Sequence, residues 1–291
     1  EREKIIILSV YCNEVGDIEM KRKSTFVLAQ MKQEGNPEIN LKAAQEKVIE
    51  AVKMYHPDLM IFPELFMSDF PNGTARSISL GSAQTLEGPF VSGMRQLAKD
   101  NKLWIVFGMN EKVENPNDDR NYNTTVILDS DGQIVSTYRK THLYDAFGYK
   151  ESENKKPGDK LFEPIDTPFG KIGLFVCYEV RFPEVARYER KMGADIIIMP
   201  TAWVKGDMKS RQFHTLINAR AIENTVYMCA CDLCEIDSMG ESVVIDPMGV
   251  PVACAGEVPT LIAATIDLDR VDEVRKKLPA YKDRRAELYS L

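Results

Sequence analysis

At residues 172–184 the chain reads Ile172-Gly173-Leu174-Phe175-Val176-Cys177-Tyr178-Glu179-Val180-Arg181-Phe182-Pro183-Glu184. The first five residues form a short apolar run, which predicts a strand buried within a sheet. The chain then enters a helix expected over about 183–192. Cys177 therefore stands at the carboxyl end of a buried strand, where ligands bind and catalytic groups project in α/β sheets.

Two more polar residues follow apolar strands in the same way. Glu64 comes after the apolar run 59–62 and Pro63, and Lys140 comes after a strand expected at 133–138. Each has an ordinary explanation on its own, because a cysteine at such a place is most often a small buried side chain. A lone Glu or Lys at a strand end is usually solvated. Strand ends can nevertheless bring the three residues together despite their separation in sequence.

The rest of the pattern alternates helices with strands. We expect helices at 37–55, 88–101, 183–192 and 207–223, and strands at 25–31, 59–62, 103–109, 123–128, 133–138, 172–176, 195–199, 226–233, 242–246 and 261–267. This order predicts an α/β protein with mixed sheets covered by helices. A faint similarity between 53–64 and 191–201, each helix, strand and proline, suggests two related halves of one domain. The end, from Val271, is polar and is expected to dock as a tail.

Composition narrows the function classes. A net charge of −7 over 291 residues argues against a nucleic acid or an anionic membrane as the main partner. No apolar run approaches the roughly 20 residues of a spanning helix, and the segment around Ile5 to Val10 lacks a cleavage pattern. The six unevenly spaced cysteines favour a reducing compartment, so we expect a cytoplasmic protein. Residues 1–23, which include a possible edge strand, are interpreted as an extension ahead of one domain at 24–291.

The sequence motifs around the three polar residues are similar to those of a known family. They are Phe62-Pro63-Glu64-Leu65, Tyr138-Arg139-Lys140-Thr141-His142-Leu143, and the run 177–184; the matches 151–152, 157–159, 167–173, 220–224 and 246–249 accompany them in order. Over residues 24–291 the chain resembles the nitrilase superfamily of carbon–nitrogen hydrolases. The resemblance implies an αββα sandwich of two mixed β-sheets, a homodimer or higher homo-oligomer, and catalytic roles for Glu64, Lys140 and Cys177. It also implies that Glu151 is a second carboxylate that orders the site.

Elementary chemistry supports those roles. A thiol with a pKa of ~8.5 is largely protonated at neutral pH and needs a base or a nearby cation. Glu64 in a mostly dry cleft could take that proton, and the thiolate of Cys177 would attack an amide carbonyl. Lys140 and the backbone N–H of Tyr178 would hold the oxyanion, one such donor being worth ~3 kcal/mol. The sequence therefore predicts amide hydrolysis through a thioester, without metal or other cofactor.

Two other kinds of site fit parts of the sequence. A Cys-His protease is disfavoured. His56 precedes Pro57 at a strand entrance, His214 lies in a helix, and His142, the best placed of the three, has no orienting Asn beside it. Cys229, Cys231 and Cys234, with Cys254 as a fourth ligand, could hold zinc. However, alternation along a strand places Cys229 and Cys231 on one buried face, so we predict buried thiols.

The substrate is less defined than the reaction. The run 178–184 and the C-terminal half are most similar to ω-amidase and deaminated-glutathione-amidase types. Where those relatives commonly carry Gly-His-Ser, this chain has Gly240-Glu241-Ser242, and we expect the Glu241 carboxylate near the mouth to repel anionic substrates. Tyr178 and Trp203 are candidate substrate-binding residues, although core packing explains Trp203 equally well. Arg181 is expected to be a structural salt-bridge partner rather than a group that recognises a substrate carboxylate.

Three functions therefore remain open. The leading one is hydrolysis of a small carboxamide by an amidase. The same residues could instead act on an N-carbamoyl amino acid or a nitrile. A non-enzymatic ligand sensor on this fold is the third, which the presence of Glu64, Lys140 and Cys177 together disfavours.

Overall fold

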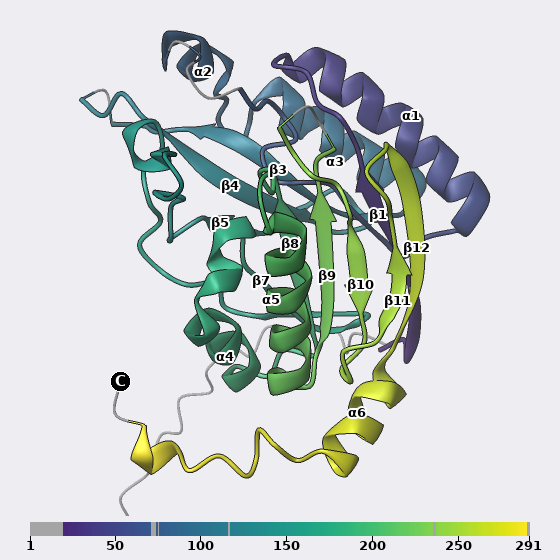
Figure 1. Ribbon diagram of the computed structural model, residues 1–291. Coiled ribbons are helices and arrows are strands. Elements are labelled where there is room, and N and C mark those ends of the chain that lie inside the picture. Colours follow the sequence, from purple (N-terminus) through teal and green to yellow (C-terminus); the bar gives the residue numbers. More distant parts are fainter. Residues whose placement is uncertain (1–19, 71–73, 75, 116, 235–236, 290–291) are drawn as a thin grey trace, which may run out of the picture.

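The computed structural model describes residues 20–70, 74, 76–115, 117–234 and 237–289 (Figure 1). The strand suggested within residues 1–19 lies outside the described residues. The first strand begins at Lys23, and the backbone of Lys21 and Arg22 already hydrogen bonds to Pro168 and Leu268. The described part of the expected extension, residues 20–23, thus runs directly into the first sheet.

The strands form two six-stranded mixed sheets. The first has the order β12-β1-β2-β3-β4-β5, with β1 (Lys23–Gln30), β2 (Leu59–Ile61), β3 (Trp104–Lys112), β4 (Asn121–Leu128), β5 (Ile134–Arg139) and β12 (Thr260–Asp267). The second has the order β11-β10-β9-β8-β7-β6, with β6 (Ile165–Thr167), β7 (Gly170–Leu174), β8 (Ile196–Thr201), β9 (Tyr227–Asp232), β10 (Val243–Ile245) and β11 (Pro251–Cys254). In each sheet three strands pair in parallel, β1-β2-β3 and β7-β8-β9, and the others pair antiparallel.

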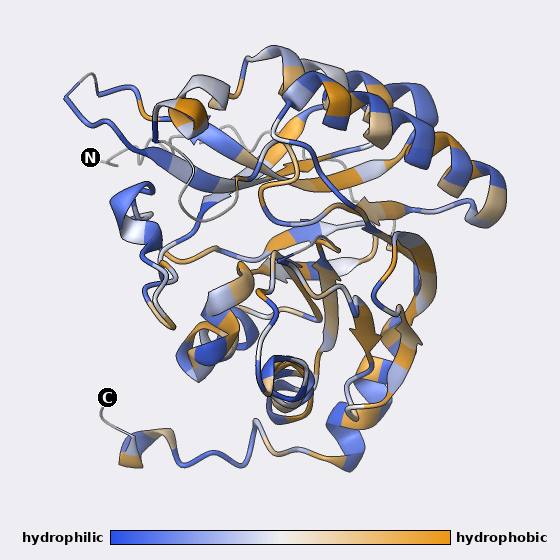
Figure 2. Cartoon of the chain, turned by 45° about the horizontal axis from the view of Figure 1, so that its top comes forward, coloured by the Kyte–Doolittle hydropathy of each residue, from blue (hydrophilic) through white to orange (hydrophobic). Residues whose placement is uncertain are grey.

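Helices cover the outer faces of the two sheets. α1 (Pro37–Tyr55) and α3 (Pro89–Asn101) pack on the first sheet, and α4 (Pro183–Lys191) and α5 (Lys209–Asn224) pack on the second (Figure 1). The hydrophobic residues lie along the strands and on the helix faces turned toward them (Figure 2). This arrangement confirms the predicted α/β class and αββα sandwich.

The apolar runs are buried on both faces, as expected for central parallel strands. In β2, Leu59 and Ile61 belong to the core between the sheets, whereas Met60 belongs to the core beneath α1 and α3. β8 occupies the matching position in the second sheet, with parallel neighbours on both sides. This correspondence supports the two related halves that the sequence suggested.

Several short elements were not predicted. They are α2 (Arg76–Ser82), β6, β11 and α6 (Leu268–Lys277), together with single 3-10 turns at Glu151–Glu153, Cys177–Arg181 and Ala286–Leu288. α6 begins at Leu268 and runs on into the segment from Val271 that was expected to be a polar tail. Its buried residues, Leu268, Val271 and Val274, recur every three residues among many charges, which conceals the amphipathic pattern. Within the described ranges no helix has the length and apolar content required to span a membrane.

Candidate active site

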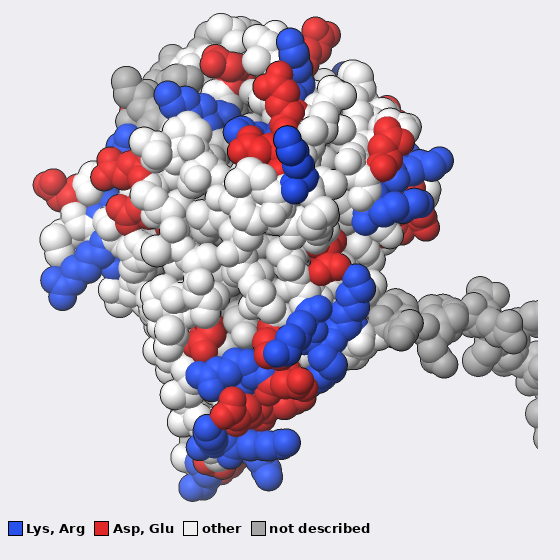
Figure 3. Space-filling view, turned by 90° about the vertical axis from the view of Figure 1, so that its right-hand side faces the viewer, with Lys and Arg blue, Asp and Glu red and all other residues white. Residues whose placement is uncertain are grey.

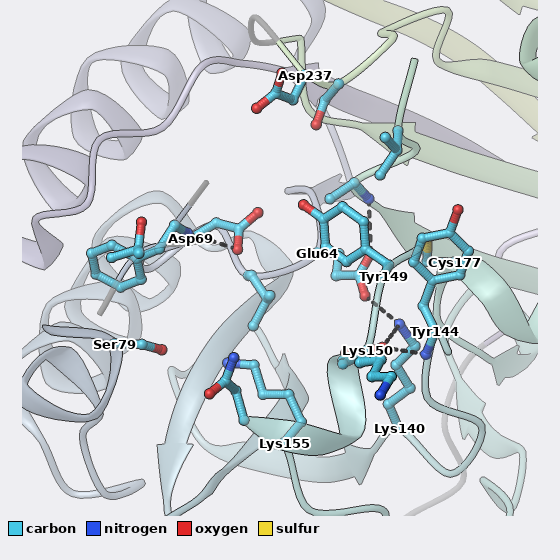
Figure 4. Close-up of a pocket in the computed structure, with 18 of the residues that line it drawn as sticks. Glu64, Asp69, Ser79, Lys140, Tyr144, Tyr149, Lys150, Lys155, Cys177 and Asp237 are labelled. Atoms are coloured by element: carbon cyan, nitrogen blue, oxygen red, sulfur yellow. Dashed lines mark hydrogen bonds and ion pairs between the residues drawn. The ribbon is translucent and has the colours of Figure 1, made fainter. Parts of the chain in front are cut away.

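A cavity of about 410 Å³ lies where loops leave the ends of several strands (Figure 4). Its lining includes Glu64 after β2, Lys140 after β5, Cys177 after β7 and Ala202 after β8. Glu151 lines it from a 3-10 turn. The structure therefore brings together the four residues that the sequence and the resemblance suggested as catalytic.

Lys140 lies between two carboxylates. Its Nζ donates to Glu64 Oε1 at 2.8 Å and to Glu151 Oε2 at 2.9 Å, and the residue is only 2% exposed. Burial alone would favour the neutral amine, but the carboxylates of Glu151 and Glu64 outweigh it and hold the pKa of Lys140 well above its ordinary value. Lys140 is therefore a permanent cation in the site rather than a base.

Asn123 of β4 fixes both carboxylates and was not predicted from the sequence. Its Nδ2 donates to Glu64 Oε1 at 2.7 Å and to Glu151 Oε1 at 3.0 Å. Burial would raise the pKa of Glu151, but the Lys140 ammonium and the bond from Asn123 bring it below its ordinary value. Glu64 is held further, since its Oε2 accepts the backbone N–H of Ala202 at 2.8 Å. A polar side chain within a buried strand is the one signal that could have identified Asn123.

Cys177 begins a 3-10 turn with φ of 48°, in the left-handed region that side chains rarely adopt. The side chain is 8% exposed and lines the cavity. Burial raises the pKa of its thiol well above the ordinary value, Glu64 adds to this effect, and Lys140 opposes it. The resting side chain is therefore a neutral thiol, which needs a base before it can act as a nucleophile.

Glu179 ties the Cys177 turn to the Lys140 segment. This fully buried carboxylate accepts the N–H of Val176 through Oε2 at 2.7 Å. Its Oε1 accepts the hydroxyl of Tyr138 at 2.7 Å and the N–H of Thr141 at 3.0 Å. Burial would raise the pKa of Glu179, but hydrogen bonds from surrounding donors, His142 and Thr141 first, lower it. The carboxylate is therefore charged and connects the two segments that carry Cys177 and Lys140.

A smaller cavity adjoins Cys177 and contains both predicted substrate-binding residues, Tyr178 and Trp203, in its wall. Trp203 is 3% exposed, packs against Phe213 and donates Nε1 to the Lys209 carbonyl, so it serves the core as well as the wall. Arg181 forms no salt bridge with another described residue, so the expected role is not seen. It donates to Gln212 Oε1 at 2.9 Å and stacks over the Trp203 ring at 4.9 Å.

The structure corrects the role expected of Glu241. Its carboxylate lies 2.7 Å from His214 Nε2 and accepts the Ser210 hydroxyl at 2.7 Å, so both contacts hold it against α5. Glu241 is absent from the described lining of the cavity, and it therefore does not guard the mouth against anions. The expectation failed because its partners lie on a helix that sequence spacing does not place beside residue 241.

Within the described ranges, the histidines and the cysteines other than Cys177 do not line the cavity. No histidine lines the cavity among the described residues; His142 stacks on Phe182, and His56 ends α1. Cys231 is buried in β9 and its thiol donates to the carbonyls of Ala29 and Ile61. Cys229 is also buried there, in line with the predicted buried thiols, and the described residues include no group of three or more His, Cys, Asp or Glu that could hold a metal ion.

Comparison with known proteins identifies the family. Residues 27–276 match the carbon-nitrogen hydrolase family. The chain is 37% identical to deaminated glutathione amidase of Escherichia coli O157:H7, over 78% of this chain and 84% of that protein. It is 33% identical to the omega-amidase NIT3 of Saccharomyces cerevisiae, over 86% and 89%. The crystal structure of Saccharomyces cerevisiae Nit3, described as a member of branch 10 of the nitrilase superfamily, matches with a TM-score of 0.80 at 30% identity, over 91% of this chain and 98% of that chain.

These matches confirm the predicted fold and the predicted amidase type of enzyme. The chain belongs to the carbon-nitrogen hydrolase family of the nitrilase superfamily.

Proposed function

We propose that the chain hydrolyses a small carboxamide to a carboxylate and ammonia, with Cys177 as nucleophile, Glu64 as general base and Lys140 as oxyanion-stabilising cation. One observation carries this proposal: the Lys140 ammonium is held between Glu64 and Glu151 in the cavity that Cys177 lines. The amidase activities named for similar proteins support the same reaction.

The first step is acylation. Glu64 accepts the thiol proton of Cys177, and the sulfur forms a bond to the amide carbon while the carbonyl π electrons move to the oxygen. An ammonium has three N–H donors, and Lys140 uses two of them on carboxylates. The third is available for the oxyanion, together with the backbone N–H of Tyr178. One such donor is typically worth ~3 kcal/mol in the transition state.

The tetrahedral intermediate then collapses. The carbon–nitrogen bond breaks, the leaving nitrogen takes the proton from Glu64, and ammonia departs from a thioester on Cys177. Glu64 next takes a proton from water as the water oxygen attacks the thioester carbon. The carbon–sulfur bond then breaks, and the sulfur takes the proton that Glu64 holds. The product leaves as the acid and gives its proton to the released ammonia, which leaves a carboxylate and an ammonium ion.

The charges in the site favour this division of roles. Lys140 remains an ammonium and cannot accept the thiol proton. Glu151 has a lowered pKa and is held by Tyr144 N–H as well as by Lys140 and Asn123, so it is suited to keeping Lys140 charged and in place. Glu64 is the carboxylate whose charge acts directly on Cys177.

The test is ammonia release from a panel of short amides, ω-amides of keto acids, N-carbamoyl amino acids and nitriles. Wild-type protein should act on carboxamides, and Cys177→Ala should abolish the release. Cys254→Ala, which changes an exposed cysteine, is the matched control. Ammonia release by Cys177→Ala would overturn the mechanism. Activity only on N-carbamoyl compounds or nitriles would instead support a carbamoyl hydrolase or nitrilase that uses the same residues. Inactivity on all four classes would support a non-enzymatic ligand sensor.

We also propose that the chain forms a homodimer. Several large apolar side chains are exposed on neighbouring parts of α5, the β10–β11 turn and β11, namely Ile222, Met248, Val250 and Val252. Figure 3 shows that the middle of the side bearing β11 and β12 has few charges, while charged residues gather toward the α6 end. Sedimentation-velocity measurements should give a dimer, and Val250→Asp with Val252→Asp should shift the mass toward a monomer.

A reducing, cytoplasmic location suits this chemistry, and we propose it on that ground. Cys177 acts only as a free thiol, and Cys229, Cys231 and Cys254 are also free cysteines. Fractionation of cells that contain the protein should place it with cytoplasmic markers, and recovery with a secreted or membrane fraction would contradict this location.

A further inference from the structure

The cavity is larger than a short amide requires. Volumes of roughly 300–1,000 Å³ hold drug-sized ligands, and this cavity has about 410 Å³. Glu64, Lys140, Glu151 and Cys177 account for one end. In Figure 4, Asp69 and Lys155 lie on the side of Glu64 away from Cys177. This second end plays no part in the reaction steps above and is available for the far end of a substrate.

Lys155 is a buried ammonium with donors to spare. It is 6% exposed, lines the cavity, and donates from Nζ to Asn110 Oδ1. Among the described residues this is the one hydrogen bond of an ammonium that carries three N–H donors. Asn110 is held rigidly in turn, because its Nδ2 donates to the Ser68 hydroxyl at 3.0 Å and to the Ser68 carbonyl. Lys155 is therefore fixed in place with two donors left for a ligand.

The surroundings of Lys155 favour an anionic ligand. Burial lowers the pKa of Lys155 to about 8, and the carboxylates of Asp69, Glu151 and Glu64 offset only part of that effect. At neutral pH the side chain remains mainly protonated. A buried charge is stabilised when it gains an oppositely charged, hydrogen-bonded partner, and a ligand carboxylate would supply that partner.

Asp69 gives the same region a negative group. The backbone around it is held by Gln33, which accepts the Asp69 N–H at 2.9 Å and donates to the Asp69 carbonyl at 3.1 Å. The Asp69 carboxylate and the Lys155 ammonium line the same cavity, on the same side of Glu64 in Figure 4. Of the neighbouring charges, Asp69 raises the pKa of Lys155 most. Asp237 and Tyr149 also line the cavity, so a second carboxylate belongs to its wall. Burial, and then the charges of Asp69 and Asp237, raise the pKa of the Tyr149 phenol. These two carboxylates would repel a ligand end that carries only negative charge. Lys155 would repel one that carries only positive charge.

We propose that this second end of the cavity binds a zwitterionic α-amino acid group, with Lys155 taking its carboxylate and Asp69 its ammonium. The substrate is then a carboxamide whose far end is an α-amino acid. This inference rests on the proposed amidase function for the orientation of the ligand, whose amide must reach Cys177.

Four amides with the same chain test it: butyramide, glutaramate, 4-aminobutanamide and L-glutamine. They share the reacting amide and differ only in having a neutral, anionic, cationic or zwitterionic far end. Ammonia release should give L-glutamine a kcat/KM at least about tenfold above each of the others, because it alone satisfies both charged groups. Equal or better turnover of butyramide or glutaramate would overturn the inference while leaving the amidase function intact.

Variants assign the two contacts. Lys155→Gln should lower the glutamine-to-butyramide ratio of kcat/KM about tenfold, and Asp69→Asn should lower the glutamine-to-glutaramate ratio by a similar factor. Lys156→Gln is the matched control, because Lys156 is the next residue and does not line the cavity; it should keep both ratios. Unchanged ratios in Lys155→Gln and Asp69→Asn would refute the assignment.

Binding measurements separate this inference from the proposed function. Calorimetric titration of the wild-type protein with L-glutamate, glutarate and butyrate needs no turnover and no variant. L-glutamate should bind at least about tenfold tighter than the other two. If no amide is hydrolysed but L-glutamate binds selectively, the amidase proposal fails and the subsite stands. If L-glutamate shows no preference, the subsite is wrong whatever the enzyme hydrolyses.

Discussion

Replacing Asn123 by alanine should disable the site without removing any group proposed to react. Asn123 donates to Glu64 at 2.7 Å and to Glu151 at 3.0 Å, so one amide aligns both carboxylates beside Lys140. A hydrogen bond to a charged group contributes about 1.5–3 kcal/mol. Losing two should lower the free energy of unfolding by about 3 kcal/mol, even if water replaces part of them.

The effect on turnover follows from geometry. Glu64 keeps its bonds to Lys140 and Ala202 N–H but loses the donor that sets its angle. A misplacement of about 1 Å at a reacting group can lower the rate ~100-fold. We therefore expect kcat to fall about 100-fold, with a smaller change in KM. The pKa of Glu151, which Asn123 helps to lower, should rise, so activity should be lost at a higher pH as the solution is acidified.

The assay compares Asn123→Ala with Asn121→Ala. Asn121 is also buried in β4, two residues away, and its side chain makes one long contact of 3.4 Å to the Ser79 carbonyl. Asn121→Ala should retain most of the wild-type kcat, and the acid limb of its pH–rate profile, where activity is lost on acidification, should stay at the wild-type pH. Equal losses in the two variants, or an unshifted acid limb in Asn123→Ala at full stability, would refute the proposed alignment of the carboxylates.

Three further predictions follow from the buried charges. Lys140→Gln should lower kcat at least about 100-fold, because the oxyanion loses its cation; steady-state ammonia release measures this, and a loss below threefold would exclude Lys140 from that role. Glu179→Gln removes a charge bound by Val176 and Thr141 N–H groups and should reduce the free energy of unfolding in urea by about 2–3 kcal/mol at pH 7. Since its folded pKa is lowered, that difference should be present above the ordinary pKa of Glu and disappear as the pH falls through the lowered one. The folded pKa of Lys155 is instead lowered to about 8 from 10.5. The unfolded chain therefore binds more protons between these values, and wild-type stability should gain about 3 kcal/mol relative to Lys155→Met as the pH rises through this window; parallel stability curves for the two proteins would contradict it.

The sequence predicts the residues that we propose as base, cation and nucleophile, because each stands just after an expected strand. The rule that strand ends meet at one edge of a sheet allows Glu64 and Cys177 to converge, and the family resemblance of the sequence motifs around them singles them out. The strand-end rule does not identify Asn123, because Asn123 lies within a strand and its contacts depend on how β4 pairs with its neighbours. The position of Glu241 was predicted wrongly for a similar reason, since its partner His214 is 27 positions earlier, half-buried on α5.

The burial of Lys155 could not be predicted from the sequence either. It sits in the polar run Glu151-Ser152-Glu153-Asn154-Lys155-Lys156, where a lysine is most simply read as solvated. Its burial comes from long-range pairing, because Lys155 forms a bridge with Asn121 at the start of β4. Composition and periodicity describe neighbours in the chain, and they carry no information about which loop folds back onto which strand.

The two buried lysines of the cavity differ in how their charge is balanced. Lys140 donates to two carboxylates, and its pKa is raised despite burial. Lys155 donates to the neutral oxygen of Asn110, and its pKa is lowered. Asn110 and Asn123 face each other as partners across β3 and β4, so one strand pair positions both lysine clusters. Lys140 is balanced by fixed carboxylates, which suits a group that must carry the same charge in every catalytic cycle. Lys155 hydrogen bonds to no carboxylate among the described residues, so an anionic group of the substrate would stabilise it each time a substrate binds.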